Sequence, residues 1–167
     1  DAGKSTHVGG AGRIQGAGHS LVDYNRAGVP LMEIVTRPVL GTGTKGPEVA
    51  RAYMEYLREM MRALGVSEAK MERGNMRCDA NISIRPKGSE ELGTKTELKN
   101  MNSFRFIERG IRAEVARQER LLGAGEAVVQ ETLHFDPRTE AITSLRSKEE
   151  AHDYRYFPEP DLPPVQI

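Results

Sequence analysis

The sequence lacks several residues and patterns that would indicate particular classes of protein. Its 167 residues include no Trp and one Cys, which excludes a disulfide framework within the chain and a cysteine-based zinc cluster. The 24 basic side chains are balanced by 24 acidic ones, whereas an autonomous nucleic-acid-binding domain usually carries a basic excess. No apolar run approaches the ~18 residues of a membrane span, and no signal-peptide pattern opens the chain, so we expect no membrane association and a cytoplasmic location. Position 1 is Asp and not Met, and we expect a chain cut from a longer protein.

Glycine, by contrast, is abundant, and it clusters near the beginning of the chain. We expect Gly-rich surface loops over residues 8–19 and 37–46. Between them an apolar, β-branched run from Val29 to Thr36 predicts a strand. The preceding Gly3-Lys4-Ser5-Thr6 is similar to the end of a P-loop, but the Gly-rich residues that follow are poor at starting the helix that a P-loop requires.

Two helices are predicted from apolar side chains that recur every three or four positions. The first covers residues 47–64, with Pro47 in its opening turn. The second covers about 103–122, with Asn102 or Ser103 as its cap. The predicted core-facing stripes are Ala50, Met54, Leu57, Met61 and Leu64 in the first helix, and Phe104, Ile107, Ile111, Val115 and Leu122 in the second.

Between these helices the apolar period changes to two, which predicts strands. From 76 to 85 the apolar positions are Met76, Cys78, Ala80, Ile82 and Ile84, and they alternate with Arg77, Asp79, Asn81, Ser83 and Arg85. A second strand over 94–99 places Lys95, Glu97 and Lys99 on one face. If the two strands pair as a hairpin, their polar faces form one surface of opposite charges. Two short strands over 127–135 and 141–146 flank an Asp136-Pro137 turn, and the mixed order favours an α+β fold.

Carboxylates on these strands are candidates for a metal site. Glu33 interrupts an apolar run, and Asp79, Asn81 and Glu97 supply oxygen atoms at alternate strand positions, which suits Mg²⁺. The alternative is a solvated, ion-paired sheet face, and the residue pattern leaves both open. The four His residues are scattered, which gives little support to a zinc site, and Cys78 falls on the apolar face, where we expect it to act as a small hydrophobic side chain.

Several long stretches resemble one family, the B subunits of aspartyl/glutamyl-tRNA amidotransferases. The stretches are DAGKSTH at 1–7, SLVDYNRAGVPLMEIV at 20–35, RCDANISIRPKG at 77–88, GTKTELKNMNSFRFIE at 93–108 and KEEAHDYRYFPEPDLPP at 148–164. The resemblance implies that residues 1–167 are the central part of a cradle domain. That domain is an α+β unit with a largely antiparallel sheet and packed helices, here incomplete at both ends, and residues 152–167 form a Pro-rich terminal segment.

The resemblance also implies a reaction. In the family, the cradle domain uses ATP and Mg²⁺ to phosphorylate the side-chain carboxylate of tRNA-linked Asp or Glu. Ammonia, released from glutamine by the A subunit, then displaces the phosphate, while the C subunit straps the complex together. The expected partners are therefore the A and C subunits of the amidotransferase and an aminoacyl-tRNA that is held mainly outside this chain. We expect the chain alone to be inactive.

Site residues are carried over from the family motifs only at matching positions. The resemblance implies Glu33 and Asp79 as metal ligands, Asp79, Glu97 and Lys99 as catalytic residues, and Arg77, Lys99, Lys4 and Arg155 as nucleotide or phosphate contacts. An alternative is a non-catalytic scaffold that docks the glutaminase partner. A stand-alone P-loop NTPase dependent on Lys4 is a third hypothesis, against which the Gly tract argues.

Overall fold

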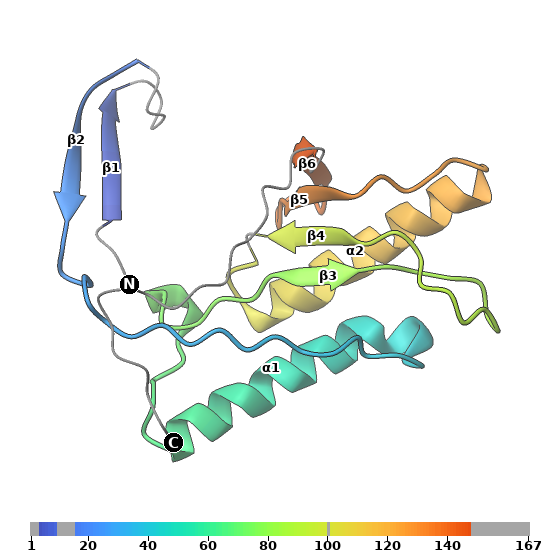
Figure 1. Cartoon of the computed structure of the whole chain (residues 1–167), viewed down its shortest axis with the longest axis horizontal. Coiled ribbons are helices and arrows are strands. Elements are labelled where there is room, and N and C mark those ends of the chain that lie inside the picture. The colour runs from blue at the N-terminus through green and yellow to red at the C-terminus, as the bar shows by residue number, and fades with distance from the viewer. Residues whose placement is uncertain (1–3, 10–15, 100, 148–167) are drawn as a thin grey trace, which may run out of the picture. The chain divides into compact units, whose positions relative to one another are not determined.

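The chain is described by a computed structural model that covers residues 4–9, 16–99 and 101–147 (Figure 1). It divides into two units, Asp1–Leu40 and Gly41–Ile167. Neither of the helices in the described part of the chain is long and apolar enough to cross a membrane.

The first unit contains an antiparallel hairpin of β1 (Lys4–Gly9) and β2 (Ala17–Asp23). A bulge between Val8 and Gly9 interrupts the pairing, and Gly9 takes φ of 90° there, which favours glycine. The predicted loop over 8–19 is therefore wrong at its two ends, which belong to strands, while residues 10–15 lie outside the described residues. Thr and Val side chains, which favour strands, occur on the two sides of the Gly tract. The many glycines between them led instead to the prediction of a loop.

Residues 29–40 form no regular structure, so the strand predicted from Val29 to Thr36 is wrong. Their side chains are exposed, and within the described residues no strand pairs with this segment. Pro30 and Pro38 each remove a backbone donor, which weakens any ladder the segment could join. The second predicted loop, 37–46, contains a short 3-10 helix, η2 (Gly43–Lys45), and the first residue of α1.

The second unit contains both predicted helices, α1 (Gly46–Ala63) and α2 (Phe104–Gly123), within one residue of the expected ends. Pro47 lies in the first turn of α1. Ser103 caps α2, since its side chain accepts a hydrogen bond of 3.1 Å from the backbone N–H of Phe106. The helices pack along each other, and Arg51 of α1 bonds Glu108 of α2 at 3.1 Å.

Four strands form the sheet of the second unit: β3 (Ala80–Ile82), β4 (Thr96–Lys99), β5 (Glu131–Phe135) and β6 (Ile142–Ser147). They lie in that order, with β3–β4 and β5–β6 antiparallel and β4–β5 parallel. The parallel pair arises because α2 carries the chain from the end of β4 back to the start of β5. The fold is α+β, as predicted, with α2 packed against a largely antiparallel sheet and α1 packed along α2.

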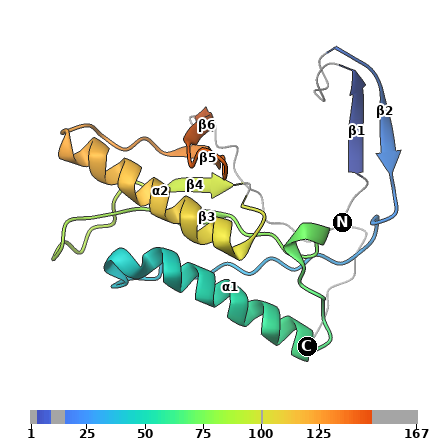
Figure 2. The same ribbon diagram turned by 180° about the vertical axis from the view of Figure 1, so that it is seen from behind.

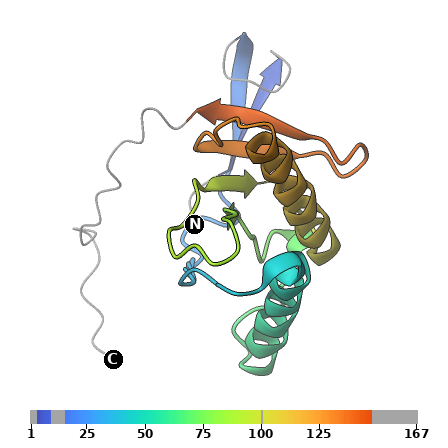
Figure 3. The same ribbon diagram turned by 90° about the vertical axis from the view of Figure 1, so that its right-hand side faces the viewer.

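One face of this sheet is covered by α2, which lies behind β3 and β4 in Figure 1 and in front of them in Figure 2. The side view in Figure 3 separates the sheet from the two helices. The core lies in this layer, and its fully buried members include Leu98, Ile107, Leu133 and Phe135. Gly110 lets α2 approach closely, because a Cβ at that position would lie 3.0 Å from both Leu98 Cδ2 and Met101 Sδ.

Candidate functional site

The site is built on the short hairpin of β3 and β4. The two strands pair at three positions, Ala80 with Leu98, Asn81 with Glu97 and Ile82 with Thr96. Since side chains alternate along a strand, Thr96 and Leu98 are buried toward α2, whereas Glu97 and the flanking Asp79 and Lys99 belong to the opposite face. The predicted hairpin is confirmed. Its first strand is shorter than the predicted 76–85, although the expected alternation of burial continues from Met76 to Ile84.

Three charged side chains gather at one end of this hairpin. The ammonium of Lys99 lies 3.5 Å from Asp79 Oδ2 and 3.5 Å from Glu97 Oε1. The other oxygen of Glu97 accepts a hydrogen bond of 3.1 Å from the hydroxyl of Thr132 on β5. Glu97 is only 17% exposed, whereas Asp79 and Lys99 reach solvent. Asp79, Glu97 and Lys99 are termed the strand cluster, in which one ammonium is held between two carboxylates.

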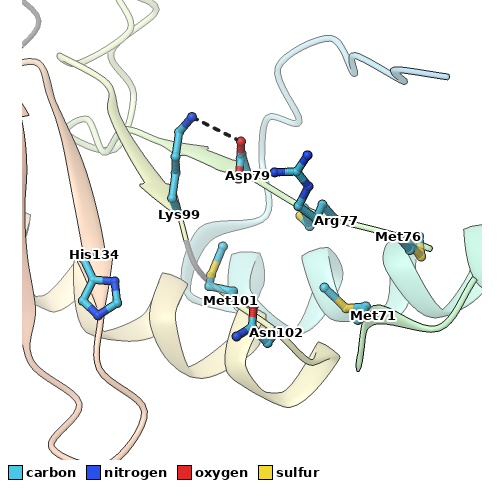
Figure 4. A pocket seen from close by; sticks show the side chains of 9 residues that line it. Met71, Met76, Arg77, Asp79, Lys99, Met101, Asn102 and His134 are labelled. Atoms are coloured by element: carbon cyan, nitrogen blue, oxygen red, sulfur yellow. Dashed lines mark ion pairs between the residues drawn. The ribbon is translucent and has the colours of Figure 1, made fainter. Parts of the chain in front are cut away.

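Two members of the strand cluster, Asp79 and Lys99, line a hollow of about 410 Å³ (Figure 4). Sulfur-bearing side chains supply the apolar part of its lining, and polar side chains supply the rest. Its lining residues are Met71, Met76, Cys78 and Met101, together with Arg77, Asp79, Lys99, Asn102 and His134. Figure 4 shows Arg77 beside Asp79. Within the described residues, the guanidinium of Arg77 makes no ion pair.

Cys78 lies in the lining of this hollow as a protonated thiol. Burial, and secondarily the negative charge of Asp79, raises the pKa of Cys78 to about 11. A thiol with this pKa is a poor nucleophile at neutral pH, since the thiolate is the reactive form. This environment agrees with the small hydrophobic role that the sequence predicts.

His134 is a lining residue that sequence reasoning missed. It lies on β5 and pairs with Lys99 of β4 in the parallel register. No spacing in the sequence relates these two residues, because their proximity depends on the crossover through α2. The only local signal is that His134 sits within an apolar strand, between Leu133 and Phe135.

Beyond Ile111, the predicted core-facing stripe of α2, which ended at Leu122, is wrong. Glu114 and Gln118 are fully buried there, whereas Leu122 is 46% exposed. The buried positions Ile107, Ile111, Glu114 and Gln118 follow one helical face. Glu114 lies three residues after Ile111, and Gln118 lies four residues after Glu114. This helical spacing could have predicted that both polar side chains belong to the buried face.

Of the other predicted site residues, two belong to the first unit and one lies outside the described residues. Glu33 lies in the exposed, irregular segment of the first unit. Lys4 begins β1 and pairs with Asp23, so the backbone there is a strand and not the helix start of a P-loop. Arg155 and the whole segment 152–167 lie outside the described residues. Of the predicted residues, the structure thus brings together Arg77, Asp79, Glu97 and Lys99.

The charge arrangement decides what these residues could hold. Among the residues that the structure describes, no group of three or more His, Cys, Asp or Glu could hold a metal ion. Asp79 and Glu97 are two carboxylates, but the Lys99 ammonium already lies within 3.5 Å of each. They therefore do not form a Mg²⁺ site by themselves, and the metal role of Glu33 and Asp79 stays a prediction. Lys99 and Arg77 instead suit a negatively charged group such as a phosphoryl group.

Comparison with known proteins gives a consistent family. Residues 1–167 match the family described as the GatB/GatE catalytic domain. The chain is 62% identical over 166 residues to the B subunit of the aspartyl/glutamyl-tRNA(Asn/Gln) amidotransferase of Streptomyces avermitilis. It is 62% identical over 167 residues to the B subunit of the same name from Clavibacter sepedonicus, and 61% identical over 166 residues to that from Cutibacterium acnes. Each match covers 99% of this chain and 33% of the relative, so the chain spans about a third of those proteins.

Proposed function

We propose that this chain, which belongs to the GatB/GatE catalytic-domain family, forms part of the site where an amidotransferase activates a carboxylate carried by tRNA. The relatives are named as B subunits of the aspartyl/glutamyl-tRNA(Asn/Gln) amidotransferase. The proposed substrate is accordingly the side-chain carboxylate of Asp or Glu on a misacylated tRNA. The proposed product is the corresponding Asn or Gln ester of the tRNA.

The chemistry requires activation because a carboxylate is a poor electrophile. In the proposed reaction, a carboxylate oxygen attacks the γ-phosphorus of ATP, and ADP leaves to give an acyl phosphate. Ammonia then attacks the acyl carbon, loses a proton, and phosphate leaves as the amide forms. Transfer of a phosphoryl group depends on positioning and on compensation of negative charge.

The observation that carries the proposal is the position of Lys99 between Asp79 and Glu97 at the edge of the hollow. Two carboxylates hold the ammonium in place, so that it can donate a hydrogen bond to a transferring phosphoryl oxygen. Arg77 supplies a second cation on the same lining. Asp79 and Glu97 act in this scheme by orienting Lys99, and no step is assigned to a metal ion.

The proposed assembly follows from the relatives' names, which describe each of them as one component of a larger enzyme. We propose a cytoplasmic heterotrimer with the A and C subunits of the amidotransferase, in which the A subunit releases ammonia from glutamine. Most of the tRNA contacts are assigned to parts of the protein beyond these residues. The chain by itself is then expected to lack activity.

The test is Lys99→Met in the full-length protein assembled with its partners. Met keeps the length of the side chain and removes the charge. We expect ATP-dependent amidation to fall by about 100-fold or more, because a positioned charge at the reacting group is removed. Glutamine hydrolysis by the glutaminase partner should be largely retained. Lys87→Met, which removes a lysine from an exposed turn away from the hollow, is the matched control.

A second candidate function is a non-catalytic scaffold that docks the glutaminase partner. Large apolar and aromatic side chains that are exposed on α1 favour this role. Tyr53, Tyr56 and Met60 are exposed and lie three or four residues apart. If docking is the only role, Lys99→Met should leave amidation unchanged, while Tyr56→Asp should dissociate the complex. The opposite pattern supports the catalytic proposal.

A further inference from the structure

A network of buried polar side chains connects α2 to the sheet, at the end of the hairpin away from the strand cluster. Glu114, Gln118 and Thr96 are each fully buried. Within the described residues, no buried side-chain nitrogen or oxygen lacks a hydrogen-bond partner. A buried polar group is costly unless it is fully bonded, and its bonds are directional. This network therefore constrains the strands more specifically than apolar packing does.

Gln118 continues the strand pairing after β3 has ended. Its Oε1 accepts a hydrogen bond of 3.2 Å from the backbone N–H of Ile84, and its Nε2 donates one of 3.1 Å to the carbonyl oxygen of Ile82. The side-chain amide thus bonds the two backbone groups that a paired strand would bond. Because an N–H only donates and a carbonyl only accepts, only one orientation of the amide and one position of the strand satisfy both bonds.

Glu114 fixes the neighbouring strand in the same way. Its Oε1 accepts hydrogen bonds of 2.8 Å from the hydroxyl of Thr96 on β4 and of 2.8 Å from Gln118 Nε2. Its Oε2 accepts a bond of 2.7 Å from Arg117 Nε, and Arg117 also lies 3.5 Å from Glu131 at the start of β5. Arg117 compensates the buried charge, and the hydrogen bond to Glu114 raises the pKa of Arg117.

The return of the chain toward β4 adds a further constraint at Ile84. A Cβ at Gly93 would lie 2.1 Å from the carbonyl oxygen of Ile84, so the two backbones approach closely there. Ile84 is then held by Gln118 through its N–H and by the Gly93 backbone beside its carbonyl.

We propose that Glu114 and Gln118 are positioning residues that set the register of β3 against β4 and thereby place Asp79 beside Lys99. The two strands pair at only three positions, and the burial of Ile82 and Leu98 excludes only those slips that exchange the two faces of the hairpin. A slip by two residues would keep the same side chains buried against α2 but would separate Asp79 from Lys99. The polar network acts on Ile82 of β3, on Ile84 just after β3 and on Thr96 of β4, and Asp79 and Lys99 lie at the other end of the same hairpin. The catalytic consequence rests on the proposed function, whereas the control of register does not.

The test compares Gln118→Met with Ile107→Val in the full-length protein assembled with its partners. Met has a volume close to that of Gln but cannot bond Ile82 or Ile84. Ile107→Val trims the same buried face of α2 without touching the network. Hydrogen exchange is followed by mass spectrometry in peptides spanning 80–86, and amidation is measured with ATP and ammonium.

In Gln118→Met we expect exchange over 80–86 to accelerate by about tenfold or more, because the amide of Ile84 loses its acceptor. We expect kcat for amidation to fall by about tenfold or more, because small displacements of positioned groups are costly, while KM for the aminoacyl-tRNA changes little. Ile107→Val should show neither effect. If Gln118→Met does not fold, Thr96→Val is the second variant, because it keeps the side-chain shape and removes the hydroxyl that bonds both Glu114 and Gln118. It is expected to show both effects to a smaller degree, since Gln118 keeps its bond to Ile84 but is less firmly oriented.

Three results separate the possibilities. Unchanged exchange over 80–86 in folded Gln118→Met would overturn the positioning role. An equal fall in kcat for Ile107→Val would also overturn it, since general destabilisation would then explain the loss. If Lys99→Met leaves amidation intact while Gln118→Met still accelerates exchange over 80–86, the proposed function fails and the control of register stands.

Discussion

Lys99 Nζ lies 3.5 Å from Asp79 Oδ2, one position beyond the last pair of residues that joins β3 to β4. Both side chains reach solvent, and an exposed ion pair of this kind contributes little to stability. The effect of this ion pair is instead electrostatic and local, because it holds the Lys99 ammonium at the edge of the hollow. This local effect is separable from the stability of the fold.

Under the proposed function, Asp79→Asn should lower amidation by the assembled full-length protein without lowering its stability. The substitution removes one of the two carboxylates that hold Lys99, so we expect amidation to fall by about tenfold or more. The melting temperature should change by no more than about 2 °C, since exposed ion pairs contribute about 0–1 kcal/mol. Glu90→Gln makes the same change of charge in an exposed turn and should leave both quantities unchanged. A loss of many degrees in Asp79→Asn would contradict this view of the pair.

Gly110→Ala should destabilise the protein by overpacking the layer between α2 and the sheet. The new methyl group would lie 3.0 Å from Leu98 Cδ2 and from Met101 Sδ, and 3.3 Å from Phe135 Cγ. We expect a loss of about 1–3 kcal/mol in the free energy of unfolding, measured in urea. Gly123→Ala at the end of the same helix meets nothing within 4 Å and should be neutral or stabilising by up to about 1 kcal/mol. Equal effects of the two substitutions would exclude the steric explanation.

Arg117→Met should be strongly destabilising. It removes the cation that compensates Glu114, whose carboxylate is fully buried. Breaking a buried ion pair from one side costs about 3–5 kcal/mol, because the remaining charge is left in a dry environment. Arg120→Met, on an exposed turn of α2, provides the control for loss of one arginine. Similar melting temperatures for the two variants would show that Glu114 does not depend on Arg117.

Stability should fall at alkaline pH through Cys78. Burial raises the pKa of this thiol to about 11, from 9.0 for an ordinary thiol. Between these values the unfolded chain loses the proton while the folded chain keeps it. The free energy of unfolding therefore decreases as the pH rises from 9 to 11, by about 2–3 kcal/mol, and this contribution is fully present below pH 9.

The measurement is urea unfolding of the protein and of Cys78→Ala from pH 8 to pH 11. The difference between the two proteins isolates the contribution of the thiol. We expect the stability of the unsubstituted protein to decline more steeply above pH 9 than that of Cys78→Ala. Parallel curves would contradict the raised pKa.

The sequence by itself determined the two helices and the polar face of the hairpin. Apolar residues at three- and four-residue spacing define α1 and α2 locally, and Ser103 marks where α2 begins. The two-residue alternations over 76–85 and 94–99 likewise assigned Asp79 to the polar face of one strand and Glu97 and Lys99 to that of the other. These features depend on near neighbours in the chain, so a local pattern is sufficient to predict them.

Strands were less predictable, because a strand exists only with a partner. The apolar run from Val29 to Thr36 has high β propensity but forms no strand, whereas the Gly-flanked segments of β1 and β2 pair with each other. Propensity describes how well a residue suits a sheet, and it does not identify the strand that will accept it.

Only the tertiary structure decided which distant residues complete the site and hold it in place. His134 lies beside Lys99 because α2 returns the chain to start a parallel strand. Glu114 and Gln118 are buried because the helix face that began with Ile107 continues under β3 and β4, where backbone groups need hydrogen-bond partners. Hydrogen bonds and burial depend on residues far apart in sequence, so no local pattern could determine them.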